Sequence, residues 1–69
     1  MVSQEIDKLL KFCLEIKGKR PDYVLLSREK YIELCYELQA PNMREFRGLD
    51  VVTTHYAGKD FLQLGYGII

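Results

Sequence analysis

The side chains best suited to chemistry in this 69-residue chain are one histidine, two cysteines and a row of glutamates. His55 could act as a general base if an acid oriented it, and Asp60 follows five residues later, across a predicted loop. No serine or cysteine stands in an obvious nucleophile elbow, and the late Gly65 and Gly67 precede no helix, as a phosphate-binding loop would require. We interpret His55 as an ordinary strand histidine and assign no catalytic residue.

The cysteines and the glutamates also favour structural interpretations. Cys13 and Cys35 fall on the apolar faces of predicted helices, with no further ligands near them, so we expect buried thiols and no zinc site. Glu29, Glu33 and Glu37 recur every four residues, which is typical of a solvated helix face. We therefore expect no metal and no cofactor, and we identify no small-molecule substrate. Two cysteines make no secreted disulfide framework, so we expect a reducing, cytoplasmic location.

Length and composition indicate one small domain over residues 1–69. A chain of this size buries only about 60% of its unfolded surface, so a partner would help its stability. An apolar fraction of 48% and five tyrosines argue for a real core. Ten acidic and ten basic residues cancel, whereas a dedicated nucleic-acid binder usually carries a positive excess. The start is acidic and no apolar window approaches membrane-helix length, so we expect no signal peptide and no membrane partner.

The middle of the chain predicts a strand that runs directly into a helix. Residues 23–26 are consecutively apolar, which indicates a central strand over residues 22–26 that is covered on both faces. Ser27 is a suitable N-cap for a helix over residues 28–39. An earlier helix is predicted over residues 4–17, with Ser3 as its N-cap and Gly18 as its stop. Its apolar positions are Ile6, Leu9, Leu10, Cys13, Leu14 and Ile16, with Phe12 off this stripe.

Short strands follow the second helix. Residues 43–47 could form a charged edge strand, and residues 50–56 read as a β-branched strand. A loop of hairpin length at residues 57–60 predicts that residues 61–68 return as an antiparallel partner, with Leu62, Leu64, Tyr66 and Ile68 facing the helices. The predicted fold class is α+β. Two helices pack on one face of a three- to four-stranded, mostly antiparallel sheet in the order helix, strand, helix, optional strand, strand, strand.

This arrangement leaves the second face of the sheet without cover. Val52 or Tyr56, together with Phe61 and Ile69, would lie there, and an exposed apolar face implies a partner. A second copy of the chain is the simplest partner, so we expect a homo-oligomer that works through protein contact. Tyrosine and arginine are common anchor residues of interfaces. The candidate contact residues are Tyr36, Arg44, Phe46, Arg47 and Tyr56.

A nucleic-acid-binding accessory or regulatory module is the alternative function. Its candidate contacts are the basic residues Lys17, Lys19, Arg20, Arg44 and Arg47. Binding of this kind would weaken steeply with salt, and charge reversal at Arg44 and Arg47 would abolish it. Solvated charge at the end of the first helix explains Lys17, Lys19 and Arg20 more simply.

Residues 22–66 carry a family resemblance. The segment Tyr-Val-Leu-Leu-Ser, a helix containing Tyr31 and Leu34, the step Phe46-Arg47-Gly48-Leu49 and the stretch 61–65 follow one another in this order. This pattern resembles the C-terminal part of tailed-phage major capsid proteins. The chain is a fraction of a coat subunit's length and has no long spine helix or extended arm. The resemblance implies a small phage- or prophage-encoded structural protein without catalytic residues.

Overall fold

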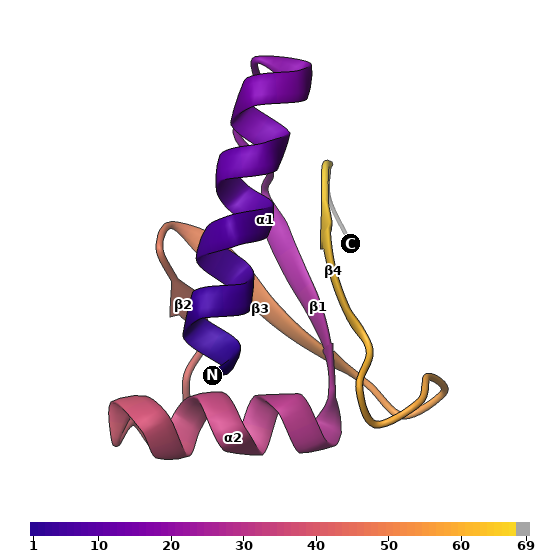
Figure 1. Cartoon of the computed structure of the whole chain (residues 1–69). Coiled ribbons are helices and arrows are strands. Elements are labelled where there is room, and N and C mark those ends of the chain that lie inside the picture. The colour runs from indigo at the N-terminus through magenta and orange to yellow at the C-terminus, as the bar shows by residue number, and fades with distance from the viewer. Residues whose placement is uncertain (68–69) are drawn as a thin grey trace.

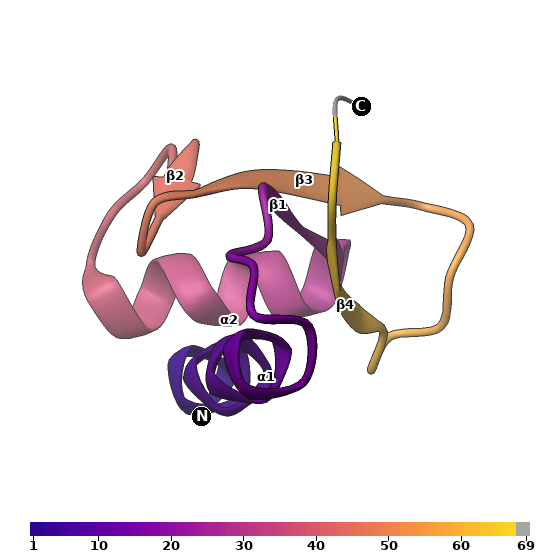
Figure 2. The same ribbon diagram turned by 90° about the horizontal axis from the view of Figure 1, so that it is seen from above.

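The computed structural model describes residues 1–67 as two helices and a four-stranded sheet. The elements in chain order are α1 (Val2–Lys17), β1 (Tyr23–Ser27), α2 (Arg28–Leu38), β2 (Glu45–Phe46), β3 (Leu49–Thr54) and β4 (Leu62–Gly65). Both helices lie on the same side of the sheet, and α2 crosses below the lower end of α1 (Figures 1 and 2). The predicted α+β class, with both helices on one face, is confirmed.

The strand order in the sheet is β2-β3-β1-β4. The strand β1 pairs in parallel with β3 and antiparallel with β4, and β2 pairs antiparallel with β3. The predicted hairpin between the last two strands is therefore wrong, because β1 lies between them. The physical reason is that β1 is the most apolar strand, and the centre of the sheet is where such a strand buries most surface. Residues 43–47 do contribute an edge strand, as predicted, although it is only two residues long.

The core lies between the sheet and the two helices. Val24 and Leu26 of β1 are fully buried and face the helices, and Leu64 and Leu62 of β4 stand opposite them in the register. The remaining buried apolar side chains come from α1, α2, the loop before β2, β2 and β3: Val2, Ile6, Leu10, Leu34, Met43, Phe46 and Leu49. One face of the sheet and one face of each helix thus form a single core.

The helix boundaries differ from the predicted ones at the chain start. The helix α1 begins at Val2 with Met1 as its N-cap, so the prediction of Ser3 as the cap is wrong. The backbone N–H of Ser3 instead donates to a carboxylate oxygen of Glu37 at 3.1 Å. A side chain from α2 therefore satisfies one of the free donors of the first turn. Gly18 ends α1 in the left-handed conformation (φ 63°), as predicted.

The junction between β1 and α2 has no loop. Ser27 is the last residue of β1 and the N-cap of α2, where its Oγ accepts a hydrogen bond from the Lys30 N–H at 3.1 Å. The prediction of this cap is confirmed. The helix ends at Leu38, one residue earlier than predicted, and Gln39 takes the left-handed conformation (φ 52°). No helix within residues 1–67 has both the length and the apolar character needed to cross a membrane.

The β2–β3 connection is a two-residue turn. Arg47 and Gly48 both have positive φ, at 55° and 79°. Positive φ at both central residues is what a type I′ hairpin turn requires, and this turn type matches the twist of the flanking strands. The charged edge strand β2 is thereby held against β3 over residues Glu45–Phe46.

Candidate functional site

The exposed apolar side chains of α1 form the largest departure from the predicted core. Leu9, Leu14 and Ile16 were expected on the buried stripe, but all three are exposed. Phe12 and Ile16 are 59% and 66% exposed. Leu9, Phe12 and Ile16 are spaced by three and four residues, so they lie along one side of the helix. We call these three residues the α1 stripe.

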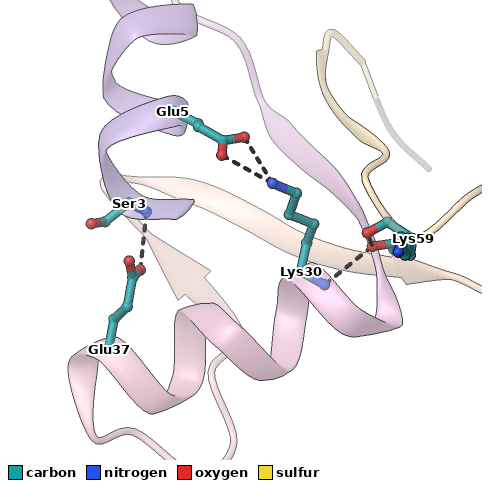
Figure 3. Close-up of polar contacts among 6 residues, drawn as sticks. Ser3, Glu5, Lys30, Glu37 and Lys59 are labelled. Carbon is teal, nitrogen blue, oxygen red and sulfur yellow. Dashed lines mark hydrogen bonds and ion pairs between the residues drawn. The ribbon is translucent and has the colours of Figure 1, made fainter. Parts of the chain in front are cut away.

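The α1 stripe points to the side of the molecule where β4 lies. Glu5 stands four residues before Leu9 on the same side of α1, and its carboxylate reaches Lys30 Nζ at 2.9 Å. Figure 3 shows Glu5 turned from α1 toward Lys30, with Lys59 and the start of β4 beyond. The Glu5 hydrogen bond raises the pKa of Lys30, against a smaller opposing effect of burial. This ion pair links α1 to α2.

The edge strand β4 continues this apolar region. Leu62 and Leu64 are half-buried and pack against the core from the helix side of the sheet. Just after the strand, the Tyr66 hydroxyl donates to the Lys19 carbonyl at 2.9 Å. Lys17 Nζ lies 4.8 Å from the centre of the Tyr66 ring, and burial, followed by the nearby Cys13 thiol, raises the pKa of Tyr66. Side chains of α1 and β4 therefore share one surface. Of the four residues predicted to face the helices, Ile68 lies outside the described residues.

The second face of the sheet is bare within residues 1–67, and Figure 2 shows both helices below the sheet. The strand register places Tyr23, Leu25 and Val52 on this face, and all three are half-buried. The same face also carries polar residues between these apolar ones: Glu45, Asp50, Thr54 and Gln63. The prediction that Val52 lies on this face is confirmed, whereas Tyr56 lies beyond β3, Phe61 precedes β4, and Ile69 lies outside the described residues.

Tyr23 covers part of this bare face itself. It stands directly opposite Gly65 in the β1–β4 register, and a Cβ built on Gly65 would overlap the Tyr23 ring. Gly65 is buried although it carries no side chain, because the ring lies over it. An aromatic ring over a cross-strand glycine replaces the packing that the glycine lacks.

Replacing Gly65 by alanine is expected to lower the free energy of unfolding by about 1 kcal/mol, because the Tyr23 ring must swing aside. Urea denaturation checks the value. Gly58→Ala is the matched control, since nothing lies within 4 Å of a Cβ at that position. We expect the control to be neutral or slightly stabilising. In a Tyr23→Ala background the Gly65→Ala cost should disappear; an unchanged cost would contradict the ring-over-glycine packing.

The five predicted contact residues do not form one surface. Tyr36 is 86% exposed on α2, and Tyr56 is fully exposed after β3. Arg47 precedes β3, so Arg47 and Tyr56 lie at opposite ends of that strand, and Arg47 pairs with Asp7 at 3.1 Å. Arg44 is exposed. Phe46 is only 8% exposed and belongs to the core, so its side chain is not available to a partner.

Tyr36 also lines an open hollow of about 560 Å³ at the end of α2. The lining residues are Tyr31, Ile32, Cys35, Tyr36, Gln39, Ala40 and Pro41. The Tyr31 hydroxyl donates to the Met43 carbonyl at 3.2 Å, and the neighbouring Cys35 thiol, together with burial, raises the pKa of Tyr31. The hollow is mostly apolar and open to solvent, so it is suited to a side chain of a partner protein.

His55 lies near two arginines. With Arg28, Arg44 and Thr53 it lines a hollow of about 330 Å³. His55 is exposed, and among residues 1–67 it makes no hydrogen bond with Asp60, so the orienting acid that a general base needs is missing there. The sequence did not single out Arg28, because only the fold brings the start of α2 next to Arg44.

The five basic residues of the nucleic-acid alternative are dispersed. Lys17 and Lys19 stand over the Tyr66 ring, and Arg20 packs against Gly48. Arg47 is paired with Asp7. Arg44 lies in the hollow near His55. Such dispersed charges do not form the continuous basic stripe that tracks a phosphate backbone.

The structure differs in two respects from what the sequence predicts for the cysteines and the glutamates of α2. Cys13 and Cys35 are free, but they are half-buried and not fully enclosed. Glu29 and Glu33 are exposed as predicted, whereas Glu37 is half-buried and accepts the Ser3 N–H. Within residues 1–67 no three His, Cys, Asp or Glu side chains gather in a group that could hold a metal ion.

Comparison with protein-family models, with curated proteins and with solved structures finds no match to this chain. The fold defines the class of the protein as a small α+β protein with an open four-stranded mixed sheet.

Proposed function

We propose that the protein is non-enzymatic and acts by self-association and protein contact, with the α1 stripe and β4 as its contact surface. The exposure of Phe12 and Ile16 beside the apolar side chains of β4 is the observation that carries this proposal. A single exposed apolar residue is ordinary on a protein surface, but a row of them next to a sheet edge marks an interaction site.

Energetics support a partner on this surface. Fully burying one large apolar side chain is worth about 1.5–3 kcal/mol, which is a substantial part of the stability of a chain this small. Within residues 1–67 the α1 stripe stays exposed, since α1 uses Val2, Ile6 and Leu10 to contact the core, and a second molecule would bury it. A second copy supplies the same surface, and two-fold pairing makes that surface self-complementary.

The bare face of the sheet is the weaker candidate. Its three apolar residues are only half-exposed, and the Tyr23 ring already covers the weakest position, Gly65. Asp50, Gln63 and Glu45 would have to be desolvated by a partner that packed flat on this face. We therefore assign the principal contact to the α1 stripe and β4.

The resemblance of residues 22–66 to part of phage coat subunits supports a structural role in a phage or prophage setting. The residues that carry the resemblance fall in β1, α2, β2, β3 and β4, and β1, α2 and β3 among them form a parallel strand–helix–strand unit. Cys13 and Cys35 are free thiols, and they support a reducing compartment such as the cytoplasm.

Sedimentation velocity over a range of concentrations tests the proposal. We expect wild-type dimers at tens of micromolar, and we expect Phe12→Lys to raise the dimer dissociation constant at least about tenfold, the equivalent of 1.4 kcal/mol. Leu14→Lys is the matched control, because Leu14 is exposed on the opposite side of the same helix. A wild-type chain that stays monomeric at these concentrations would overturn self-association, and equal effects of both lysines would overturn the assigned surface.

A further inference from the structure

The outer edge of β4 lacks the usual protection against pairing. The strand is the last in the order β2-β3-β1-β4, so one of its edges has no partner strand within residues 1–67. Its sequence, Leu-Gln-Leu-Gly, contains no charged residue and no proline, the two devices that most often block edge-to-edge pairing. The opposite edge carries Glu45 in β2 and is flanked by Arg44 and Arg47. Within residues 1–67 the β4 edge is therefore unprotected along its whole length, whereas on the other side of the sheet β2 covers Leu49 and Asp50 of β3.

The backbone groups that face this open edge can be identified. The Ser27 N–H donates to the Phe61 carbonyl at 3.0 Å, and the Asp22 N–H donates to the Gly65 carbonyl at 2.9 Å. The Phe61 and Gly65 carbonyls thus point toward β1, whereas the Phe61 N–H donates to the Gly58 carbonyl at 3.0 Å. Because alternate residues of an antiparallel ladder face the same neighbour, Leu62 and Leu64 direct their N–H and C=O groups outward.

We propose that β4 pairs antiparallel with β4 of a second copy, with the two Gln63 residues opposite each other at the two-fold axis. This interface deepens the self-association proposed above and rests on it. Leu62 then lies opposite Leu64 of the second copy, and their outward N–H and C=O groups form four hydrogen bonds across the dimer. A shift by one residue would place a leucine opposite Gln63 on the wrong face of the sheet, so the pairing register is restricted.

The α1 stripe supports this pairing because it adds buried interface area that the short strand cannot supply. A four-residue strand alone buries far less than the roughly 1,200 Å² that a stable interface needs. The stripe lies on the side of α1 that faces β4, so an added strand would carry its leucines under Phe12 and Ile16. The dimer would have one eight-stranded sheet, with all four helices on the same face.

Charge complementarity favours a second copy as the occupant. If the pairing of the two β4 strands continues beyond their ends in the same register, Asp60 lies opposite Tyr66 of the second copy. The Tyr66 ring carries Lys17 Nζ at 4.8 Å and Lys19 Nζ at 5.8 Å. Asp60 is exposed and makes no ion pair among the residues that the structure describes. Each interface would therefore contain two such acidic–basic clusters, related by the two-fold axis.

A cysteine at the two-fold axis tests the register directly. In a chain with Cys13→Ser and Cys35→Ser, Gln63→Cys should form a disulfide-linked dimer under mild oxidation. The two residues form a non-hydrogen-bonded pair with Cα atoms about 4.5 Å apart, within the range that a disulfide spans. Thr53→Cys, at an exposed position of β3, is the matched control and should remain unlinked. Cross-linking by the control alone, or by neither variant, would overturn β4 pairing.

Charge reversal provides an independent readout. We expect Asp60→Lys to weaken dimerisation about tenfold, since each dimer loses two ion-pair clusters, and we expect added Lys17→Asp and Lys19→Asp to restore it. One set of results would separate the two proposals: the wild-type chain dimerises and Phe12→Lys prevents dimerisation, but Gln63→Cys does not cross-link and Asp60→Lys has no effect. The β4 pairing would then be wrong, and the proposed function would stand. If the wild-type chain is monomeric, both proposals fall.

Discussion

Leu26→Ala is expected to lower the free energy of unfolding by about 2–5 kcal/mol, the cost of emptying a fully buried leucine site. Leu26 has no exposed surface and lies in β1, between β3 and β4, on the face that both helices cover. A 69-residue domain has a total stability of about 3–10 kcal/mol, so the variant should be largely unfolded or strongly destabilised. Urea denaturation followed by circular dichroism measures the change.

The neighbouring residue is the matched control for this prediction. Leu25 has the same side chain on the same strand, but it points to the bare face of the sheet and is half-buried. Leu25→Ala should therefore cost only about 1 kcal/mol. An equal cost for the two leucines would show that another molecule covers the bare face, and it would contradict our assignment of the contact surface to the α1 stripe and β4.

Ser27→Ala is expected to lower the free energy of unfolding by about 2–3 kcal/mol, because one buried hydroxyl makes two hydrogen bonds. Its Oγ accepts from the Lys30 N–H at 3.1 Å and donates to the Lys59 carbonyl at 2.6 Å. In Figure 3 a dashed line runs from the Lys30 backbone toward the labelled Lys59. The substitution removes the cap of α2 and releases the segment that leads into β4. Thermal denaturation and the chemical shifts of residues 58–61 report the two effects.

Ser3→Ala is the control for the serine prediction. Ser3 lies in the first turn of α1, and its backbone N–H, not its side chain, donates to Glu37. Its replacement by alanine should leave stability within about 0.5 kcal/mol of wild type. If both serine variants behaved alike, the Ser27 hydroxyl would not be the link between α2 and the segment before β4.

Local features of the fold could be predicted from the sequence. The apolar run at residues 23–26 and the cap at Ser27 identify the β1–α2 junction, because both signals come from adjacent residues. The pairing of the last two strands could not be found in this way. A four-residue loop suits a hairpin, but the chain places β1 between β3 and β4, and that choice depends on burial of a strand more than thirty residues away from β4.

The sequence predicted an exposed apolar surface that needs a partner, but it placed that surface on the second face of the sheet and named Tyr36, Arg44, Phe46, Arg47 and Tyr56 as its contacts. The exposed apolar surface exists, but the residues differ: Leu9 and Ile16 were expected in the core, and Phe46 was expected on the surface. The reason is the direction in which these side chains point around the helix. Val2, Ile6 and Leu10 occupy the face of α1 that meets the core, so the α1 stripe on the adjoining side stays exposed. Helix periodicity alone contains no information on how wide an apolar face the sheet covers.

Amide hydrogen exchange at Leu62 and Leu64 tests the central claim most directly. These two amides face the open edge of β4, so they should exchange quickly in a dilute, monomeric sample. At tens of micromolar we predict that they become protected as the second copy pairs with β4, whereas the exposed residues Gln4 and Lys59 keep their rates. Exchange at Leu62 and Leu64 that is equally fast at low and high concentration would contradict association through this strand.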